Sequence, residues 1–131
     1  MMNLIVAGLE IFMTAGIIGF WIYFFLVENK KPNQREGYLE FERSFPLPDL
    51  GWAAPCLIIG AIGLIIDQKF GFVFSIAGGS ALIFLGLLDI SHNLQYGGYK
   101  GEKLDIILNL IVNVFCIVFG PIFMIFGWIN I

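Results

Sequence analysis

Charged residues are scarce in this 131-residue chain, which argues against an ordinary soluble domain. They make up 13% of the sequence, whereas 59% of the residues are hydrophobic and the mean hydropathy is +0.89. A soluble domain carries about a quarter charged residues. The formal net charge of −3, without any basic stripe, argues against a nucleic-acid partner. We therefore expect an integral protein of the cell membrane that has the lipid bilayer as its solvent.

Histidine and cysteine are also rare, which limits metal and cofactor chemistry. The chain has one His and two Cys, and the two Cys lie far apart without CxxC spacing. One His cannot supply two haem ligands, and the scattered acids lack the spacing of a dedicated zinc site. The sequence contains no GxSxG, Walker, HExxH or dinucleotide-binding motif. We expect neither a metal nor a cofactor, and no motif specifies an enzymatic reaction.

Long apolar runs, in contrast, are abundant. Four of them are visible, at residues 4–27, 50–66, 70–88 and 104–131. A helix that crosses a bilayer needs about 20 residues. The second run is marginal because Pro46 and Pro48 limit its extension backward, and Asp49 is a candidate N-cap there. The first, third and fourth runs meet the length requirement outright.

The third helix is expected to continue beyond its apolar run, to Tyr96. An Asp at a helix C-terminus opposes the helix dipole, so Asp89 is a poor end point. Gly97 and Gly98 form a better stop, because glycine readily takes the left-handed conformation that ends many helices. The short segment 67–69 should join the second and third helices as a tight hairpin. A re-entrant hairpin that does not cross fully is the alternative.

The basic residues predict the orientation of the chain. Six of the seven Lys and Arg residues lie in segments 28–49 and 97–103, and only Lys69 lies elsewhere. Short loops rich in Lys and Arg stay in the cytoplasm. We expect an all-α integral membrane protein, an antiparallel four-helix transmembrane bundle with both termini outside and these two loops inside. A single domain, 1–131, then has spans at about 4–27, 50–66, 70–96 and 104–131.

Small residues at four-residue spacing predict where these helices approach one another. The candidate pairs are Ala15 with Gly19, Cys56 with Gly60, and Ser75 with Gly79. In membranes such pairs let helix backbones pack closely. Because four helices enclose little interior, we also expect a homo-oligomer or a partner membrane protein.

Glu10 is the most costly residue in the apolar runs. It lies about six residues into the first run, roughly 9 Å deep at the helical rise per residue. An intramembrane acid should face the bundle interior and is a functional candidate. No Lys or Arg lies within the apolar spans to pair with it. Two alternatives stay open: a protonated carboxyl group satisfied by hydroxyls such as that of Ser75, or a site for a proton, a cation or a basic ligand.

Two further groups of polar residues point toward the cytoplasmic side. Asn109 and Asn113 continue a stripe that begins at Asp105, with one residue per helical turn on the fourth helix. Asp89 and His92 lie three residues apart on the third helix. The amides either bond across helices or line a hydrated path, and His92 is either part of that path or an interfacial residue.

Three classes of function fit this pattern. The first is transport of protons, cations or a small polar solute, with Glu10 as the binding site, Asn113 and Asn109 as a relay, and Asp89 and His92 as the exit. The second is a non-enzymatic accessory or assembly subunit of a larger membrane complex. The third is a lipid-acting enzyme whose acids, with His92, lie at the level of the headgroups; its candidate acids are Asp89, Glu40 and Glu42.

Overall fold

A computed structural model describes residues 1–30, 36–100 and 102–131, and all regular structure in these ranges is helical, without strands. Three helices are long and continuous: α1 (Met2–Leu26), α5 (Lys69–Tyr96) and α6 (Lys103–Asn130). A fourth helical segment, Tyr38–Ile65, is built from shorter pieces. All four segments are long and apolar enough to cross a membrane.

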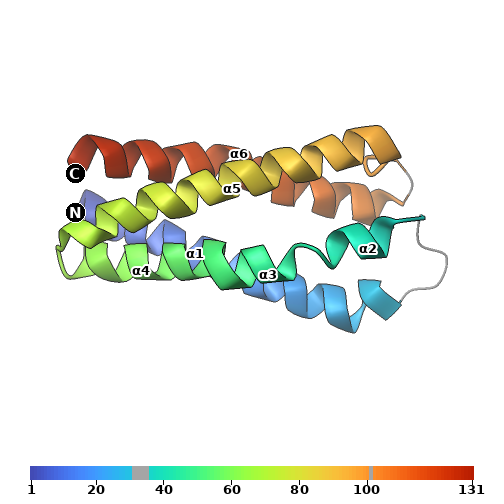
Figure 1. Cartoon of the computed structure of the whole chain (residues 1–131), viewed down its shortest axis with the longest axis horizontal. Coiled ribbons are helices and arrows are strands. Elements are labelled where there is room, and N and C mark those ends of the chain that lie inside the picture. The colour runs from blue at the N-terminus through green and yellow to red at the C-terminus, as the bar shows by residue number, and fades with distance from the viewer. Residues whose placement is uncertain (31–35, 101) are drawn as a thin grey trace.

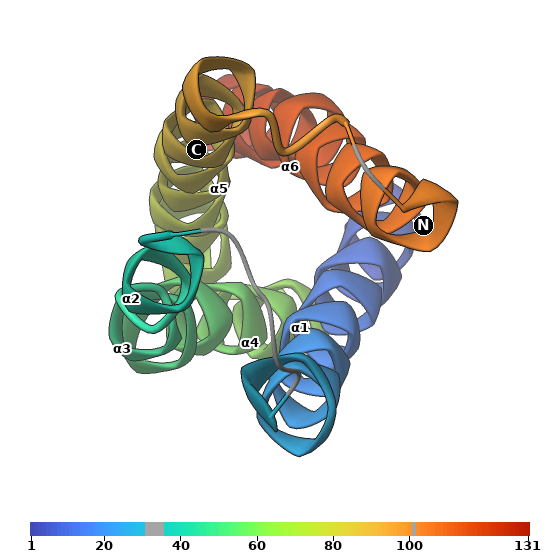
Figure 2. The ribbon, with the colours of Figure 1, turned by 90° about the vertical axis from the view of Figure 1, so that its right-hand side faces the viewer.

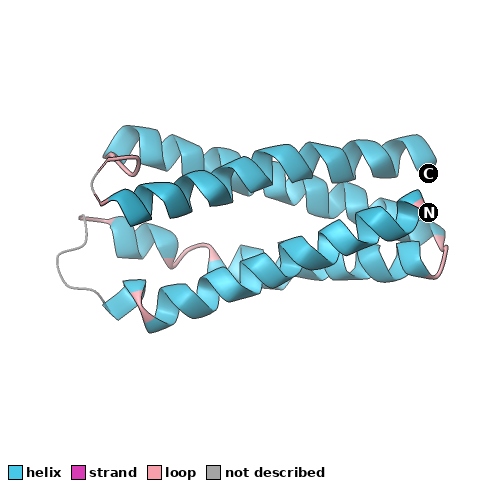
Figure 3. Cartoon of the chain, turned by 180° about the vertical axis from the view of Figure 1, so that it is seen from behind, coloured by secondary structure: helices cyan, strands magenta, loops and turns pink. Residues whose placement is uncertain are grey.

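The four segments lie side by side along one axis (Figure 1). Both chain ends and the turn between α4 (Ala54–Ile65) and α5 lie at one end of the bundle, which we call the terminal end. The other end, which we call the loop end, carries the short helix η1 (Glu28–Lys30), the helix α2 (Tyr38–Glu42) and the α5–α6 connection (Figure 3).

The second segment begins well before residue 50, the start expected from its sequence. It runs through α2, a single turn α3 (Pro46–Pro48) and a π-helical stretch η2 (Asp49–Ala53) into α4. Pro46 and Pro48 are tolerated because they occupy a first turn, where a missing N–H costs no hydrogen bond. In η2 the helix widens, and the Ala54 N–H bonds the Asp49 carbonyl five residues back. The prolines therefore do not end the segment.

Helix α5 ends where the Gly97-Gly98 pair predicts. Tyr96 is its last residue, and Gly97 takes the left-handed conformation with φ 75°. The Gly98 N–H then bonds the Asn93 carbonyl, which satisfies one of the last carbonyls of the helix. Asp89 consequently lies inside α5, two turns before its end.

Close backbone approaches hold neighbouring helices together. Gly63 on α4 and Gly71 on α5 face each other so closely that a Cβ on either would meet the backbone of the other. Gly79 on α5 and Gly120 on α6 form an equivalent contact. Gly19 on α1, by contrast, has open space around it, so the predicted pair with Ala15 makes no close helix contact within the described part of the chain.

The order of packing around the bundle is α1, α4, α5, α6, as the end-on view shows (Figure 2). Helix α1 packs on α4, α4 on α5 and α5 on α6, whereas α1 and α6 do not pack along their lengths. One aromatic pair bridges these two helices: the Phe12 and Phe115 rings lie 6.0 Å apart. A cluster of buried, mostly aromatic residues, which includes Trp21, Phe24 and Phe45, forms toward the loop end. The bundle therefore has one loosely closed side, between α1 and α6.

Candidate functional site

A cavity of about 200 Å³ lies between α1, α5 and α6 in the loop half of the bundle. Most of its wall is apolar; Phe12, Ile17 and Phe20 contribute from α1, and Leu82 and Leu85 from α5. Gly16 also lines it, and a Cβ at that position would meet nothing within 4 Å. The cavity exists because α1 and α6 are joined by aromatic side chains and not by close backbone packing.

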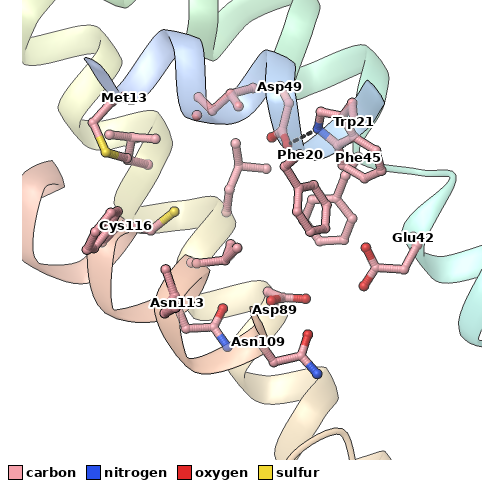
Figure 4. A pocket seen from close by; sticks show the side chains of 18 of the residues that line it. Met13, Phe20, Trp21, Glu42, Phe45, Asp49, Asp89, Asn109, Asn113 and Cys116 are labelled. Carbon is pink, nitrogen blue, oxygen red and sulfur yellow. Dashed lines mark hydrogen bonds between the residues drawn. The ribbon is translucent and has the colours of Figure 1, made fainter. Parts of the chain in front are cut away.

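The polar part of the cavity wall consists of acids and amides. Its carboxyl groups come from three elements, and two amides come from α6: these residues are Glu42, Asp49, Asp89, Asn109 and Asn113. Figure 4 shows Asp89, Asn109 and Asn113 together on the α5 and α6 side of the cavity. Among the described residues, no Lys, Arg or His lines this cavity. A carboxylate oxygen only accepts hydrogen bonds, whereas an amide side chain both donates and accepts them.

Asp49 is tied to α1 by a hydrogen bond that the sequence did not suggest. The Trp21 indole Nε1–H donates to Asp49 Oδ2 at 2.7 Å (Figure 4). Asp49 is the first residue of η2 and Pro48 is the N-cap, so the prediction of Asp49 as an N-cap is wrong. Trp21 is 3% exposed. It therefore belongs to the bundle interior.

Asn109 and Asn113 hold the α5–α6 connection against α6. The Asn109 amide donates to the Gly98 carbonyl at 2.8 Å, and the Asn113 amide donates to the Tyr99 hydroxyl at 2.5 Å. Each amide nitrogen thereby gives one of its two hydrogens to the loop. The Asn113 Oδ1 atom is buried and has no hydrogen-bond partner among the described residues. It is a buried acceptor on a residue that lines the cavity.

His92 lies beside the cavity region but does not line the cavity. Its ring stacks on Phe41 with centroids 3.6 Å apart and planes 6° apart, and Tyr96 lies 4.8 Å away. Phe41 belongs to α2, so this stack fixes α2 against α5. Asp89, one turn before His92, accepts a bond from the Asn93 amide at 3.3 Å.

Glu10 lies in a separate, tightly packed site nearer the terminal end. The side chain is 0% exposed, and Ser75 Oγ of α5 lies 2.5 Å from its Oε1. Gly60 of α4 makes room for it, because a Cβ at that position would lie 2.9 Å from Glu10 Oε2. Oε2 has no hydrogen-bond partner in the described part of the chain. The carboxyl group is thus enclosed where α1, α4 and α5 meet.

Counting hydrogens at Ser75 indicates how this site is satisfied. Ser75 Oγ lies within bonding distance of two oxygens, Glu10 Oε1 and the Gly71 carbonyl at 2.8 Å. A serine hydroxyl has one hydrogen, so it can donate to only one of them. Both contacts become hydrogen bonds when Glu10 carries a proton and donates it to Ser75 Oγ. A buried carboxylate without a countercharge would also be costly. The geometry therefore favours a neutral Glu10.

The structure brings together three of the five residues singled out from the sequence. One cavity is lined by Asn113, Asn109 and Asp89. Glu10 and His92 do not line this cavity, and they lie in two separate environments, beside Ser75 and beside Phe41. Sequence reasoning missed Asp49 as a cavity residue. The sequence did offer one signal for a role of Asp49: it is an acid that directly precedes a strongly apolar run, after Pro48.

No group of three or more His, Cys, Asp or Glu side chains that could hold a metal ion occurs in ranges 1–30, 36–100 and 102–131. The sequence matches no protein-family model. Comparison with curated proteins and with solved structures finds no significant similarity.

Proposed function

We propose that this chain is an antiparallel four-helix transmembrane protein of the cell membrane, with both termini outside. Four segments have the length and composition of membrane spans. The loop end carries Lys30, Arg43, Lys100 and Lys103, and the positive-inside rule assigns that end to the cytoplasm. The cavity would then open its polar part toward the cytoplasmic half of the bilayer.

We further propose that the protein transports a small solute and binds it in this cavity. The observation that carries the proposal is the lining itself: an apolar wall with a few convergent polar groups, which is typical of ligand sites. An apolar cavity of about 150 Å³ admits benzene. A volume of about 200 Å³ suits a molecule of one ring and a few further atoms.

This proposal keeps only part of the route predicted from the sequence and leaves out Glu10 and His92 as solute contacts. Asn113, Asn109 and Asp89 would contact the solute, because all three line the cavity. Glu10 would instead have a structural role, since it is enclosed by Ser75 and Gly60 outside the cavity. His92 would position α2 through its stack on Phe41.

Filling the cavity from Gly16 tests the proposal. Gly16 is exposed, and a Cβ at this position would have no atom within 4 Å. Gly16→Leu should therefore leave the folding of the helix intact. Gly19→Leu on the same helix is the matched control, because Gly19 is equally open and does not line the cavity. We expect Gly16→Leu to abolish binding of benzyl alcohol to the protein in nanodiscs, measured by calorimetry, and Gly19→Leu to leave it intact. Equal binding to both variants would overturn the assignment of the cavity.

An accessory subunit is the second candidate, and the Glu10 site favours it. A buried acid bonded to a neighbouring helix is an assembly device that needs no solute. Purification of the full chain in mild detergent separates the two proposals. A stoichiometric partner membrane protein would favour the accessory role, whereas a self-sufficient monomer or homo-oligomer that binds benzyl alcohol would favour transport.

A further inference from the structure

We propose that the cavity opens sideways to the bilayer, between α1 and α6, and accepts a neutral apolar solute that is dissolved in the membrane. This inference rests on the proposed function, because it names the class of solute and the route by which that solute reaches the same cavity. Three observations support it: the position of the exposed lining residues, the depth of the opening along the bundle, and the bonding of the polar groups in the wall.

The exposed part of the cavity lining lies on one side of the bundle. Four lining residues are exposed, and all of them belong to the two helices that do not pack along their lengths: Phe12 and Gly16 on α1, and Ile111 and Phe115 on α6. The other lining residues are buried or half-buried. The Phe12 and Phe115 rings, 6.0 Å apart, bridge this side of the bundle. The opening therefore lies between α1 and α6, beside this aromatic pair.

The opening lies far from both ends of the bundle. Phe12 is ten residues after the first residue of α1, which starts at the terminal end, or about 15 Å along the helix. Phe115 is twelve residues after the first residue of α6, which starts at the loop end, or about 18 Å along that helix. The hydrocarbon core of a bilayer is about 30 Å thick. In the transmembrane arrangement proposed above, the opening faces acyl chains near the middle of the membrane.

The depth of the opening determines which solutes can use it. A solute that enters between Phe12 and Phe115 must first dissolve in the hydrocarbon core. An ionised group loses its hydration there at a large cost in free energy, whereas a neutral apolar molecule concentrates there. The route therefore selects a neutral solute before the cavity wall contacts it.

The polar side chains of the wall add little attraction for a polar solute, because each carboxyl or amide side chain already has a partner. The hydrogen bonds join Asp49 to Trp21, Asp89 to Asn93, Asn109 to Gly98, and Asn113 to Tyr99. Glu42 has a partner as well. The Oδ1 atom of Asn113 has no partner among the described residues, but this atom is itself buried. The surface that remains for a solute is mostly apolar, and includes Ile17, Phe20 and Leu82.

Trp21 offers a direct reporter of the occupied cavity. It lines the cavity, whereas Trp52 and Trp128, the other two tryptophans, are exposed and do not. A background that carries Trp52→Phe and Trp128→Phe leaves Trp21 as the one indole fluorophore of the chain. A brominated solute that enters the cavity should quench its fluorescence. The full chain is studied in nanodiscs, and empty nanodiscs give the concentration of each solute in the bilayer.

The test compares three quenchers that share one bromophenyl ring: para-bromotoluene, para-bromobenzyl alcohol and para-bromobenzylammonium. At equal bilayer concentration, we expect para-bromotoluene to quench Trp21 saturably and at least as strongly as the alcohol, and the ammonium to quench at least tenfold less. Gly16→Leu should abolish the saturable quenching, and Gly19→Leu should not. Equal quenching by the ammonium, or saturable quenching by the alcohol alone, would overturn the apolar class of solute while the cavity assignment stands. Absence of saturable quenching by all three would overturn both.

A second arm distinguishes a free solute from the acyl chain of a lipid, since both are neutral and apolar. Nanodiscs made of lipid with brominated acyl chains are compared with ordinary nanodiscs, without added solute. We expect the brominated lipid to quench Trp21 to the same extent with Gly16 and with Gly16→Leu. Quenching that is lost in Gly16→Leu would assign the cavity to a lipid chain and overturn the proposal of a free solute.

A third arm tests the sideways route. Phe12→Ala widens the opening, so the association of para-bromotoluene, followed by stopped-flow fluorescence of Trp21, should become at least threefold faster. Phe84→Ala is the matched control, because Phe84 is an exposed phenylalanine of α5 that does not line this cavity. If Phe12→Ala fails to fold, Ile111→Ala widens the same opening from α6. An unchanged association rate in a folded variant that still binds para-bromotoluene would overturn entry between α1 and α6.

Discussion

Replacing Glu10 distinguishes a neutral structural acid from a charged binding site. Glu10→Gln keeps the shape of the side chain and replaces the carboxyl hydroxyl with an amide NH₂. That amide can donate to Ser75 Oγ while Ser75 donates to the Gly71 carbonyl, as in the hydrogen-bonding scheme proposed above. Because no bond is lost and no charge is removed, we expect the free energy of unfolding to change by less than about 1 kcal/mol.

Glu10→Ala should have a much larger effect. The side chain is 0% exposed and fills the space between Gly60 and Ser75, so its removal leaves a void where three helices meet. Truncation of large buried side chains to alanine typically costs about 2–5 kcal/mol. Ser75 keeps the Gly71 carbonyl as an acceptor, which favours the lower part of that range. We expect a loss of about 2–3 kcal/mol, within that range.

Ser75→Ala gives an intermediate reference point. It removes the interhelical bond to Glu10 and creates almost no void. Interhelical side-chain hydrogen bonds in membranes contribute about 0.6–2 kcal/mol. The expected order of stability is therefore wild type and Glu10→Gln, then Ser75→Ala, then Glu10→Ala.

Reversible unfolding in mixed micelles, followed by circular dichroism, measures this order. Glu40→Gln is the matched control, since Glu40 is an exposed acid on α2. Infrared spectroscopy adds an independent readout, because a protonated carboxyl group has a C=O stretch that Glu10→Gln should remove. If Glu10→Gln were as destabilising as Glu10→Ala, or if that stretch were missing in the wild type, Glu10 would be a charged group and the ion-site alternative would gain support.

Two further variants test the packing and the α1 contact. Gly71→Ala should destabilise the protein by at least about 2 kcal/mol, because its Cβ would lie 2.5 Å from the Leu64 backbone nitrogen and overpacking costs are of this size. Gly8→Ala should be neutral or stabilising in the same unfolding assay, because a Cβ at position 8 would have no atom within 4 Å. Trp21→Phe should cost about 1–2 kcal/mol by removing the donor to Asp49, and it should cost less in an Asp49→Asn background. A double-mutant cycle measures this coupling, and additive effects would argue against it.

The positions of α1, α5 and α6 follow closely from composition, with bounds within two residues of the expected ranges. Apolar runs of this length leave few other possibilities. The end of α5 was also predictable, because the Gly97-Gly98 pair outweighs the change in hydropathy at Asp89. The second segment was less predictable. In the sequence, its prolines indicate the start of the helix. In the structure, a single helical turn contains the prolines and a π-helical stretch follows them, so the helical segment begins earlier.

The candidate site was predictable only within each helix. Asn109 and Asn113 share a face because four-residue spacing places them one turn apart, and both bond the loop that follows α5. The helix that packs against this face is determined by the order of the helices around the bundle. A single sequence does not give this packing order. For this reason the sequence linked Glu10 to the α6 stripe, whereas Glu10 packs against α4 and α5.

Two polar contacts explain how α1 acquires a definite rotation about its own axis. Apolar side chains alone specify rotation weakly in a bilayer, because lipid tails are as apolar as leucine. Glu10 and Trp21 lie eleven residues apart, which places them on the same face of α1 and roughly 16 Å apart along it. Glu10 is held by Ser75 and Trp21 by Asp49, so both ends of that face are fixed toward the α4–α5 side. Gly16, six residues beyond Glu10, lies on a different part of the α1 surface and lines the cavity together with Trp21. The buried acid would thus serve the cavity without lining it, by fixing which side of α1 the solute meets.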